Sequence, residues 1–184
     1  MWAWKTSATP GTRGRQARTL VSSATQKSYK TSYRGTVFSC PMDTTSEPVR
    51  FDTKIAVLLR DDLEVWQRLN VTAFLVSGIA QRAPEVIGEP YADADGTEYL
   101  PMFRQPVLVF EGSKEDLTSS HGRAVSRGVA LTVFTADLFA TGNDRDNRAA
   151  VRAVSRESLD LVGIAVFGPR NAVDKIFKGA RMHP

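Results

Sequence analysis

Short apolar runs separated by charged and turn-forming residues organise the chain beyond residue 50. Four of these runs are rich in β-branched and aromatic residues and are continuous rather than alternating, at residues 55–59, 107–110, 129–134 and 161–167. A continuous apolar run is typical of a strand that helices cover on both faces of a sheet. We therefore expect these four segments to be core strands.

The stretch between the first two runs has a helical period instead. Trp66, Leu69, Ala73, Val76 and Ala80 recur at intervals of three and four residues. This spacing predicts a helix whose apolar stripe packs on the sheet.

Two extended stretches follow at residues 86–91 and 98–103, on either side of the sequence DADG at residues 93–96. Extended segments around a glycine-containing turn predict a hairpin. The acidic residues of the turn resemble the beginning of a calcium-binding loop, but such a loop needs further ligands and a closing glutamate. The hairpin turn is the preferred interpretation.

Three more helices are predicted from their start and stop signals. Ser113 is placed to cap a helix over residues 114–128, and residues 143–157 and 171–181 are expected to form two others. Because helices alternate with strands, the sequence predicts an α/β fold. We expect an α/β/α sandwich around a mixed sheet of about four core strands plus the hairpin.

Charge divides the chain into two parts. The first 41 residues contain seven basic residues and no acidic one, which leaves the rest of the chain with 17 basic and 20 acidic residues and a net charge of −3. Residues 1–49 are predicted to be a disordered, basic, Ser/Thr-rich tail, and residues 50–184 a single domain. The charge of the domain does not favour nucleic-acid binding, although a nucleic-acid partner is left open.

Three interpretations of the tail stay open. It could be disordered without function, it could follow from a start codon assigned too early, with Met42 as the natural start, or it could be a targeting or nucleic-acid-binding arm.

Cysteine and histidine are scarce, which limits the chemistry of the chain. Cys40 is the only cysteine, and His121 and His183 lie in separate segments, so neither a disulfide framework nor a metal site nor a cofactor is predicted. His121 is expected on a helix surface or at the edge of the core. The apolar runs are too short to cross a bilayer, and we expect a soluble, cytoplasmic protein without a membrane partner.

Arginines at positions 145, 148, 152 and 156 would form one stripe along the third predicted helix. A solvated helix face is the simpler interpretation, and a ridge that contacts phosphates is the alternative.

Polar residues at the ends of two predicted strands are the candidates for a binding site. Arg60 and Asp62 follow the first strand, and ligands collect at the carboxyl ends of strands in open α/β sheets. Asp62 could instead cap the following helix. Asn70 and Thr72 are polar residues in an otherwise apolar helix, where they could serve the site or a structural network.

The densest polar cluster follows the third strand, with Asp137, Thr141 and Asn143. Loop capping and a pocket wall explain this cluster equally well. We predict that the junctions near residues 60 and 137 meet in space and form one polar recess.

Three stretches carry a resemblance to a known family: TKIAVLLRDDLEVWQRLNVTAFLVSGIA, DADGTEYLPMFRQPVLVFEG and LVGIAVFGPRNAVDKIFKGARM. They resemble the bacterial family called domain of unknown function two thousand, over nearly all of residues 50–184. That family is similar in fold to type 2 peptidyl-tRNA hydrolases and has no settled activity.

The resemblance to the hydrolases implies roles for several residues. Their first strand ends in R-x-D-L, which Arg60, Asp62 and Leu63 match. Their D-A-G-x-T motif places a catalytic Asp four residues before a Thr, and Asp137 and Thr141 keep that interval, although Leu-Phe replaces Ala-Gly. Asp137 and Thr141 are therefore the candidate catalytic residues.

The C-terminal part also matches the hydrolases, whose G-P turn and D-x-[VI] helix look like Gly168, Pro169, Asp174 and Ile176.

Other positions depart from the hydrolase pattern. Gln67 and Leu69 occupy the places of two lysines, Ala73 that of a glutamine and Val76 that of a histidine. The cationic groups that would hold a tRNA phosphate or polarise the ester are absent, so the residues do not predict canonical peptidyl-tRNA hydrolysis.

The leading hypothesis is a module that binds or transforms a small molecule. Arg60 would attract an anionic or carbonyl group, Asp137 would act as base or acceptor, and Asn70, Thr72 and Thr141 would orient the ligand. Two alternatives stay open: a hydrolase of aminoacyl or peptidyl esters on tRNA with a rearranged site, and a protein-interaction scaffold. A homodimer is also left open.

Overall fold

The four apolar runs form adjacent strands of one sheet. The computed structural model describes residues 49–183, so the predicted tail, with Cys40 and Met42, lies outside the described residues except for Val49. The strands of the sheet are β1 (Thr53–Arg60), β4 (Val107–Gly112), β5 (Leu131–Thr135), β6 (Leu161–Pro169) and the short β7 (Arg181–Met182). Their order is β5-β6-β1-β4-β7, with β1 and β4 parallel and the other neighbours antiparallel.

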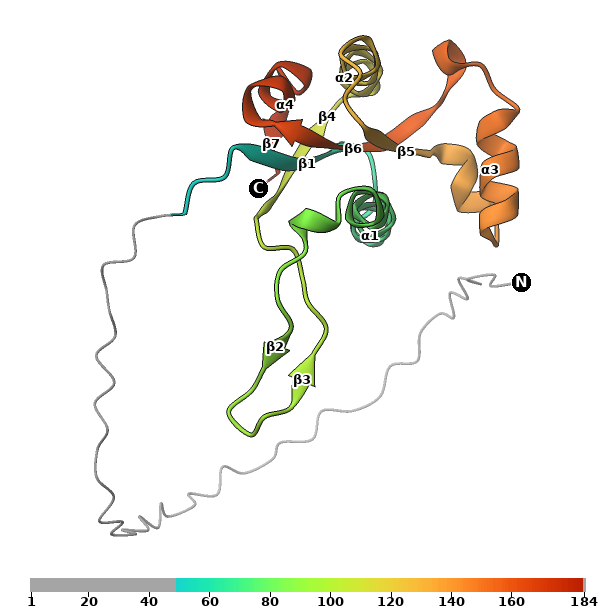
Figure 1. Ribbon diagram of the computed structural model, residues 1–184. Coiled ribbons are helices and arrows are strands. Elements are labelled where there is room, and N and C mark those ends of the chain that lie inside the picture. Colours follow the sequence, from blue (N-terminus) through green and yellow to red (C-terminus); the bar gives the residue numbers. More distant parts are fainter. Residues whose placement is uncertain (1–48, 184) are drawn as a thin grey trace, which may run out of the picture. The chain divides into compact units, whose positions relative to one another are not determined.

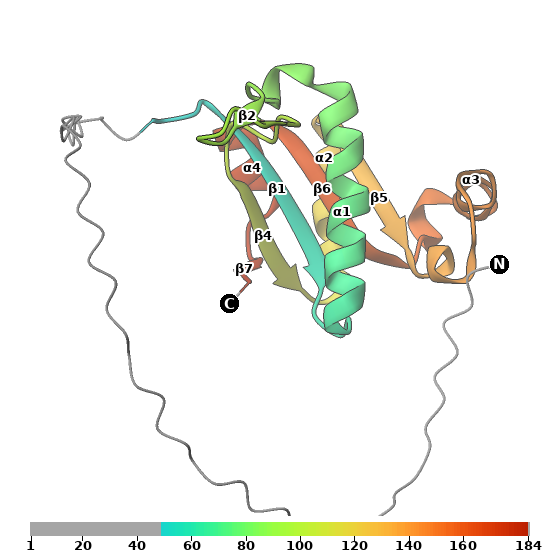
Figure 2. The same cartoon turned by 90° about the horizontal axis from the view of Figure 1, so that it is seen from below.

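Helices cover both faces of the sheet, which confirms the mixed α/β architecture (Figure 1). The helices are α1 (Val65–Arg82), α2 (Lys114–Ser126), α3 (Asp144–Arg152) and α4 (Arg170–Ile176), with short 3₁₀ segments η1 (Pro84–Val86), η2 (Ala136–Ala140) and η3 (Arg156–Ser158). α2 and α4 pack on one face, α1 packs on the other, and α3 lies beside the β5 edge (Figures 1 and 2).

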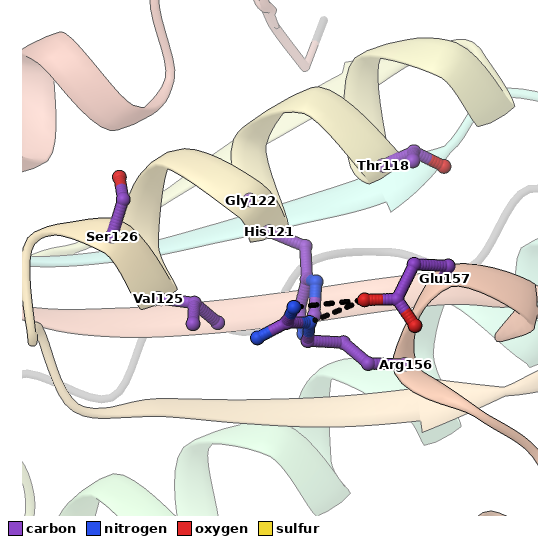
Figure 3. A pocket seen from close by; sticks show the side chains of 7 residues that line it. All are labelled: Thr118, His121, Gly122, Val125, Ser126, Arg156 and Glu157. Carbon is purple, nitrogen blue, oxygen red and sulfur yellow. Dashed lines mark hydrogen bonds and ion pairs between the residues drawn. The ribbon is translucent and has the colours of Figure 1, made fainter.

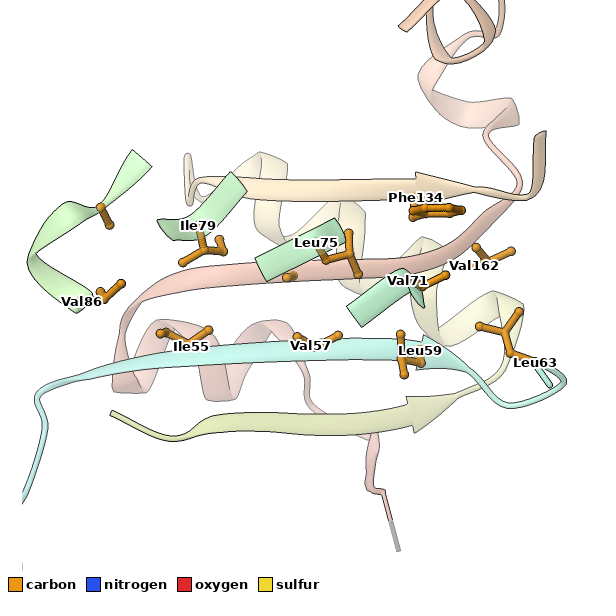
Figure 4. Close-up of a cluster of buried hydrophobic side chains, with 12 residues drawn as sticks. Ile55, Val57, Leu59, Leu63, Val71, Leu75, Ile79, Val86, Phe134 and Val162 are labelled. Atoms are coloured by element: carbon orange, nitrogen blue, oxygen red, sulfur yellow. The ribbon is translucent and has the colours of Figure 1, made fainter. Parts of the chain in front are cut away.

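The core has two halves because β1 sends alternate side chains to opposite faces. Ile55, Val57 and Leu59 point towards α1, while Ala56 and Leu58 point towards α2 and α4. All five are buried. The half beneath α1 is drawn in Figure 4.

The predicted helix forms as α1 and packs on the sheet, but most of its predicted apolar stripe was wrong, and of the predicted residues Val76 packs against the core. The helix packs on the sheet through Val71, Leu75 and Ile79, all buried, whereas Trp66 is 60% exposed and Leu69 is 69% exposed. α1 is apolar on most sides, so helical spacing alone does not select the face that is buried.

The hairpin forms around the predicted turn. β2 (Tyr91–Ala92) pairs with β3 (Glu98–Tyr99), and the Asp93 carboxylate accepts hydrogen bonds from the backbone N–H groups of Asp95 and Thr97. A hydrogen bond from the Tyr99 hydroxyl is the largest of the effects that lower the pKa of Asp93 to about 2. The hairpin projects from the sheet on the α1 side (Figure 1).

The last two predicted helices are shorter than expected. α3 ends at Arg152, so Arg156 lies in η3 and leaves the predicted arginine stripe. α4 ends at Ile176, and Gly179, with φ of 97°, turns the chain back into β7. The left-handed backbone there favours glycine and ends the helical path.

Within residues 49–183, no helix combines the length and the apolar character that a membrane crossing requires.

Candidate functional site

The α1 face of the sheet has an uncovered strand. Neighbouring strands lie about 4.8 Å apart and a helix is about 10 Å wide, so one helix cannot cover five strands. α1 packs on β1, β5 and β6, and β4 lies to one side of it with no helix in front (Figure 2). On the opposite face, α2 and α4 share the sheet between them.

The uncovered strand forms the floor of a cavity of about 540 Å³, which we call the trough. A volume of this size is ordinary for a small-molecule site. The trough is lined by Leu59, by Arg68, Leu69, Thr72 and Ala73 of α1, by Val107, Leu108 and Val109 of β4, and by Met182 and His183.

Most of the trough is apolar. Val107 and Val109 are half-buried against the core on the α1 side, and Leu69 and Ala73 stand on the neighbouring helix wall. The Thr72 hydroxyl donates to the Arg68 carbonyl at 2.7 Å, which leaves its lone pairs for a ligand. The body of a ligand here would contact mainly hydrocarbon.

One end of the trough is charged, and Arg68 is its central residue. Its guanidinium donates to the Leu63 carbonyl at 2.9 Å, the Asp61 carbonyl at 2.6 Å and Glu111 Oε2 at 3.0 Å. Nη1 also lies 3.1 Å from His183 Nε2. Because arginine only donates, this contact requires the imidazole nitrogen to accept.

Glu111 connects two arginines at this end. Its side chain is 14% exposed and pairs with Arg68 at 3.0 Å and with Arg181 at 3.3 Å. Two guanidinium groups around one carboxylate leave one net positive charge beside the apolar floor. Arg181 is 71% exposed and can move towards a ligand at low cost.

The predicted corner at Arg60 lies at the same sheet edge as the end of β5. Arg60 pairs with Asp62 at 2.7 Å and with Asp160 at 3.0 Å, and Lys114 reaches Asp160 at 2.8 Å. The backbone carbonyl of Asp160 also accepts the Ala136 N–H at 2.9 Å, so Asp160 contacts both junctions.

These ion pairs shift two ionisation equilibria. Burial lowers the pKa of Arg60, but the hydrogen bond and charge of Asp62 and the charge of Asp160 outweigh it and raise the pKa. The hydrogen bond from Lys114 is the main cause of the lowered pKa of Asp160. The charged groups of this corner form ion pairs with one another and so neutralise one another.

The predicted residues after β5 do not line the trough. Asp137 is exposed in η2 and makes no hydrogen bond or ion pair with the described residues. The Thr141 hydroxyl bonds to the Leu138 carbonyl and to Asn147, and Asn143 caps α3 by accepting the Asp146 N–H. Thr141 and Asn143 therefore form hydrogen bonds with residues close to them in the sequence.

The two site residues that were predicted on α1 lie in different environments. Thr72 lines the trough, whereas Asn70 is exposed on α1 and does not. The ligand or catalytic roles of the seven predicted residues stay predictions.

Aromatic packing links α1 to the β5–η2 junction. Trp66 and Phe139 have ring centroids 5.9 Å apart, and Phe134 lies 5.2 Å from Phe139 and 5.8 Å from Phe74. The predicted junctions thus lie at one end of the sheet, linked through Asp160 and through the contact of Trp66 with Phe139, while the trough opens on the other side of α1. The polar recess that these junctions were expected to form stays a prediction.

A second cavity of about 360 Å³ lies between α2 and η3 (Figure 3). His121 is 8% exposed and lines it together with Arg156 and Glu157, which pair with each other. Burial, and then the charge of Arg156, lower the pKa of His121, although Glu157 opposes this. His121 therefore lies at the edge of the core. No group of three or more potential metal ligands occurs in the described part of the chain.

Arg68, Glu111 and His183 were not among the predicted site residues. Glu111 had a usable signal, because it is a carboxylate at the carboxyl end of an apolar parallel strand, the argument applied to Arg60 and Asp62. Arg68 and His183 had none, since their proximity depends on the position of β7.

Comparisons with known proteins agree on the family and the fold. The family model described as protein of unknown function DUF2000 matches residues 53–184. A solved structure of a protein of unknown function from Agrobacterium tumefaciens is 47% identical, with a TM-score of 0.72, and the match covers 73% of this chain and 100% of that one. No curated protein matches the chain.

Proposed function

We propose a binding function for this chain, which belongs to the DUF2000 family: the trough holds a small molecule with an apolar body and a negatively charged end. The observation that carries the proposal is the trough itself, an apolar cavity of about 540 Å³ whose one end has a net positive charge. Apolar walls with a few converging polar groups are usual for small-molecule sites.

The charges favour an anionic end of the ligand. Arg68 is held in place by two backbone carbonyls and Glu111, so it contributes a fixed positive charge. Arg181 is exposed and can exchange part of its contact with Glu111 for a ligand carboxylate. A neutral ligand of the same shape would gain the apolar contacts alone.

The hydrolase resemblance is compatible with this assignment. Leu69 and Ala73, which stand in the places of a lysine and a glutamine that serve the hydrolase substrate, line the trough here. Apolar side chains at these positions would suit binding of a hydrocarbon body better than polarisation of an ester.

A thermal-shift experiment with paired probes tests the proposal. Octanoate and octanamide share a hydrocarbon chain and differ in charge, and a ligand of the native state raises the melting temperature. We expect octanoate to raise the melting temperature in a concentration-dependent way and octanamide to raise it less.

Two variants locate the binding site. Ala73→Trp fills the trough from an exposed helix position and should abolish the octanoate shift, whereas Gln81→Trp, exposed on the same helix and away from the trough, should retain it. An octanoate shift of equal size in both variants would place binding elsewhere. The absence of any shift in the unmodified protein with octanoate and longer fatty acids would refute the proposal.

Hydrolysis of aminoacyl or peptidyl esters on tRNA is a second proposal, supported by the carboxylate of Asp137, which has no partner among residues 49–183 and lies at the same end of the sheet as Arg60. It predicts turnover of an acylated tRNA that is lost in Asp137→Ala and retained in Asp95→Ala, a hairpin-turn carboxylate. An inactive unmodified protein would remove it.

A further inference from the structure

Exposed apolar side chains gather on one side of the molecule. Of the eleven large apolar residues that are exposed within residues 49–183, eight belong to α1 or to residues 88–103. We call residues 88–103, which contain the hairpin, the arm. Leu100 on the arm is 87% exposed and Met102 is 60% exposed. A concentration of this kind marks a surface that another molecule covers.

The arm is also acidic. It contains four acidic residues and no basic one, at positions 89, 93, 95 and 98, and all four are exposed. The charged end of the trough has the opposite sign, because Arg68 and Arg181 surround Glu111. One side of the chain therefore carries both an acidic apolar projection and a positively charged apolar hollow.

From this complementarity we infer that two copies of the chain associate through the α1 side, with the arm of each copy lying over the trough of the other. Each copy carries both an arm and a trough, so a dimer with a two-fold axis forms the arm–trough contact twice. Two-fold symmetry is the usual symmetry of homodimers. Leu100 and Met102 would lie over the open side of the partner's trough, and the arm carboxylates would face its arginines.

The geometry of the arm agrees with a two-fold arrangement. The arm joins the sheet at the beginning of β4, and Glu111 lies at the end of that strand. A two-fold axis parallel to the sheet and perpendicular to β4 reverses the strand in the second copy, so the arm of one copy reaches the charged end of the other. The partner's arm would then cover the open side of the trough. The inference does not rest on the proposed ligand, because the dimer forms through protein groups alone.

Light scattering coupled to size-exclusion chromatography on the full chain tests this inference. We expect a dimer that dissociates on dilution, and a dissociation constant raised about tenfold or more by Leu100→Asp. Val125→Asp is the matched control, because Val125 is an exposed apolar residue on α2, away from the arm and the trough, and should leave the dimer intact. Leu100 is exposed, so its replacement should leave the thermal unfolding of the monomer unchanged.

A charge exchange identifies the pairing. Arg181→Glu and Glu98→Arg should each weaken self-association, because each places like charges together. A mixture of the two variants should form a mixed dimer, since both arm–trough contacts then join opposite charges. A monomeric unmodified protein at every concentration, a dimer unaffected by Leu100→Asp, or variants that do not recover on mixing would each overturn the inference.

Discussion

The two faces of the central sheet are built from the same strands and have different properties. On the face of α2 and α4, two helices cover the strands. On the α1 face, one helix leaves β4 exposed, and the trough and most of the exposed apolar side chains lie on that side. The candidate site thus lies where no helix covers β4, and the density of charged residues matters less for its location.

The Arg60 and Arg68 clusters show the same contrast in detail. Both are arginines near the carboxyl end of β1, and both pair with carboxylates. The Arg60 cluster includes Asp160 and Lys114 and neutralises itself, whereas the Arg68 cluster borders an apolar cavity. A charged cluster becomes a candidate site when a cavity of ligand size lies beside it.

The largest expected effect distinguishes the two sides of α1. Leu75→Ala should lower the free energy of unfolding by about 2–5 kcal/mol, because it leaves a cavity beneath the helix. Leu69→Ala removes the same atoms from an exposed side chain and should change the free energy of unfolding by about 0.5 kcal/mol or less. Urea denaturation of both variants measures the difference, and equal losses would show that Leu69 is buried in solution.

Close packing of α1 on β6 provides a second test. A Cβ atom at Gly163 would lie 2.6 Å from Val71 Cγ1 and 3.0 Å from Leu75 Cδ1, so Gly163→Ala should cost about 1–3 kcal/mol. Gly122 lies within α2 with nothing within 4 Å, and Gly122→Ala should stabilise by up to about 1 kcal/mol. Calorimetry should therefore show melting temperatures that move in opposite directions. A shift of the same sign would contradict the packing of α1.

The opposite face depends in part on the cap of α2. The Ser113 hydroxyl accepts the Asp116 N–H at 3.2 Å, and the Asp116 carboxylate accepts the Ser113 N–H at 2.9 Å. Ser113→Ala should lower the free energy of unfolding by about 1 kcal/mol. Ser119→Ala, at an exposed position within the same helix, is the control and should have little effect in chemical denaturation. Equal behaviour of the two variants would argue against the cap.

The smallest expected effect is a pH dependence from His121. Burial lowers its pKa below the ordinary value of 6.5, so the unfolded chain takes up a proton before the folded chain does. The free energy of unfolding should fall as the pH drops below about 6.5 and should level off below the folded pKa.

Chemical denaturation at about pH 7.5 and about pH 5.5 would measure this effect as a difference in the free energy of unfolding. Each pH lies roughly one unit from the ordinary pKa of histidine. His121→Gln should reduce the difference between the two values, whereas His183→Gln is the comparison for the other histidine of the chain. An identical pH dependence in His121→Gln and the unmodified protein would contradict the burial of the neutral ring.

Sequence patterns were sufficient for most of the architecture. The four apolar runs are β1, β4, β5 and β6, the DADG turn closes the hairpin, and Ser113 caps α2. These features depend on local propensity and on continuous burial, which a short window of residues records. The junctions near residues 60 and 137 also lie at one end of the sheet, where both contact Asp160, and the polar recess expected between them stays a prediction.

The site depended on tertiary structure. β7 forms because Gly179 redirects the chain to the free edge of β4, and this brings His183 to Arg68. The face of α1 that packs on the sheet could not be predicted either, because Val71 and Leu69 are both apolar and lie on nearly opposite sides of the helix. By itself, the sequence determined the four core strands, the hairpin turn and the approximate positions of the four helices, because continuous apolar runs, turn residues and helix caps are local signals. Only the folded chain decided which helix face is buried and which strand stays uncovered, because those choices depend on partners that are distant in the sequence.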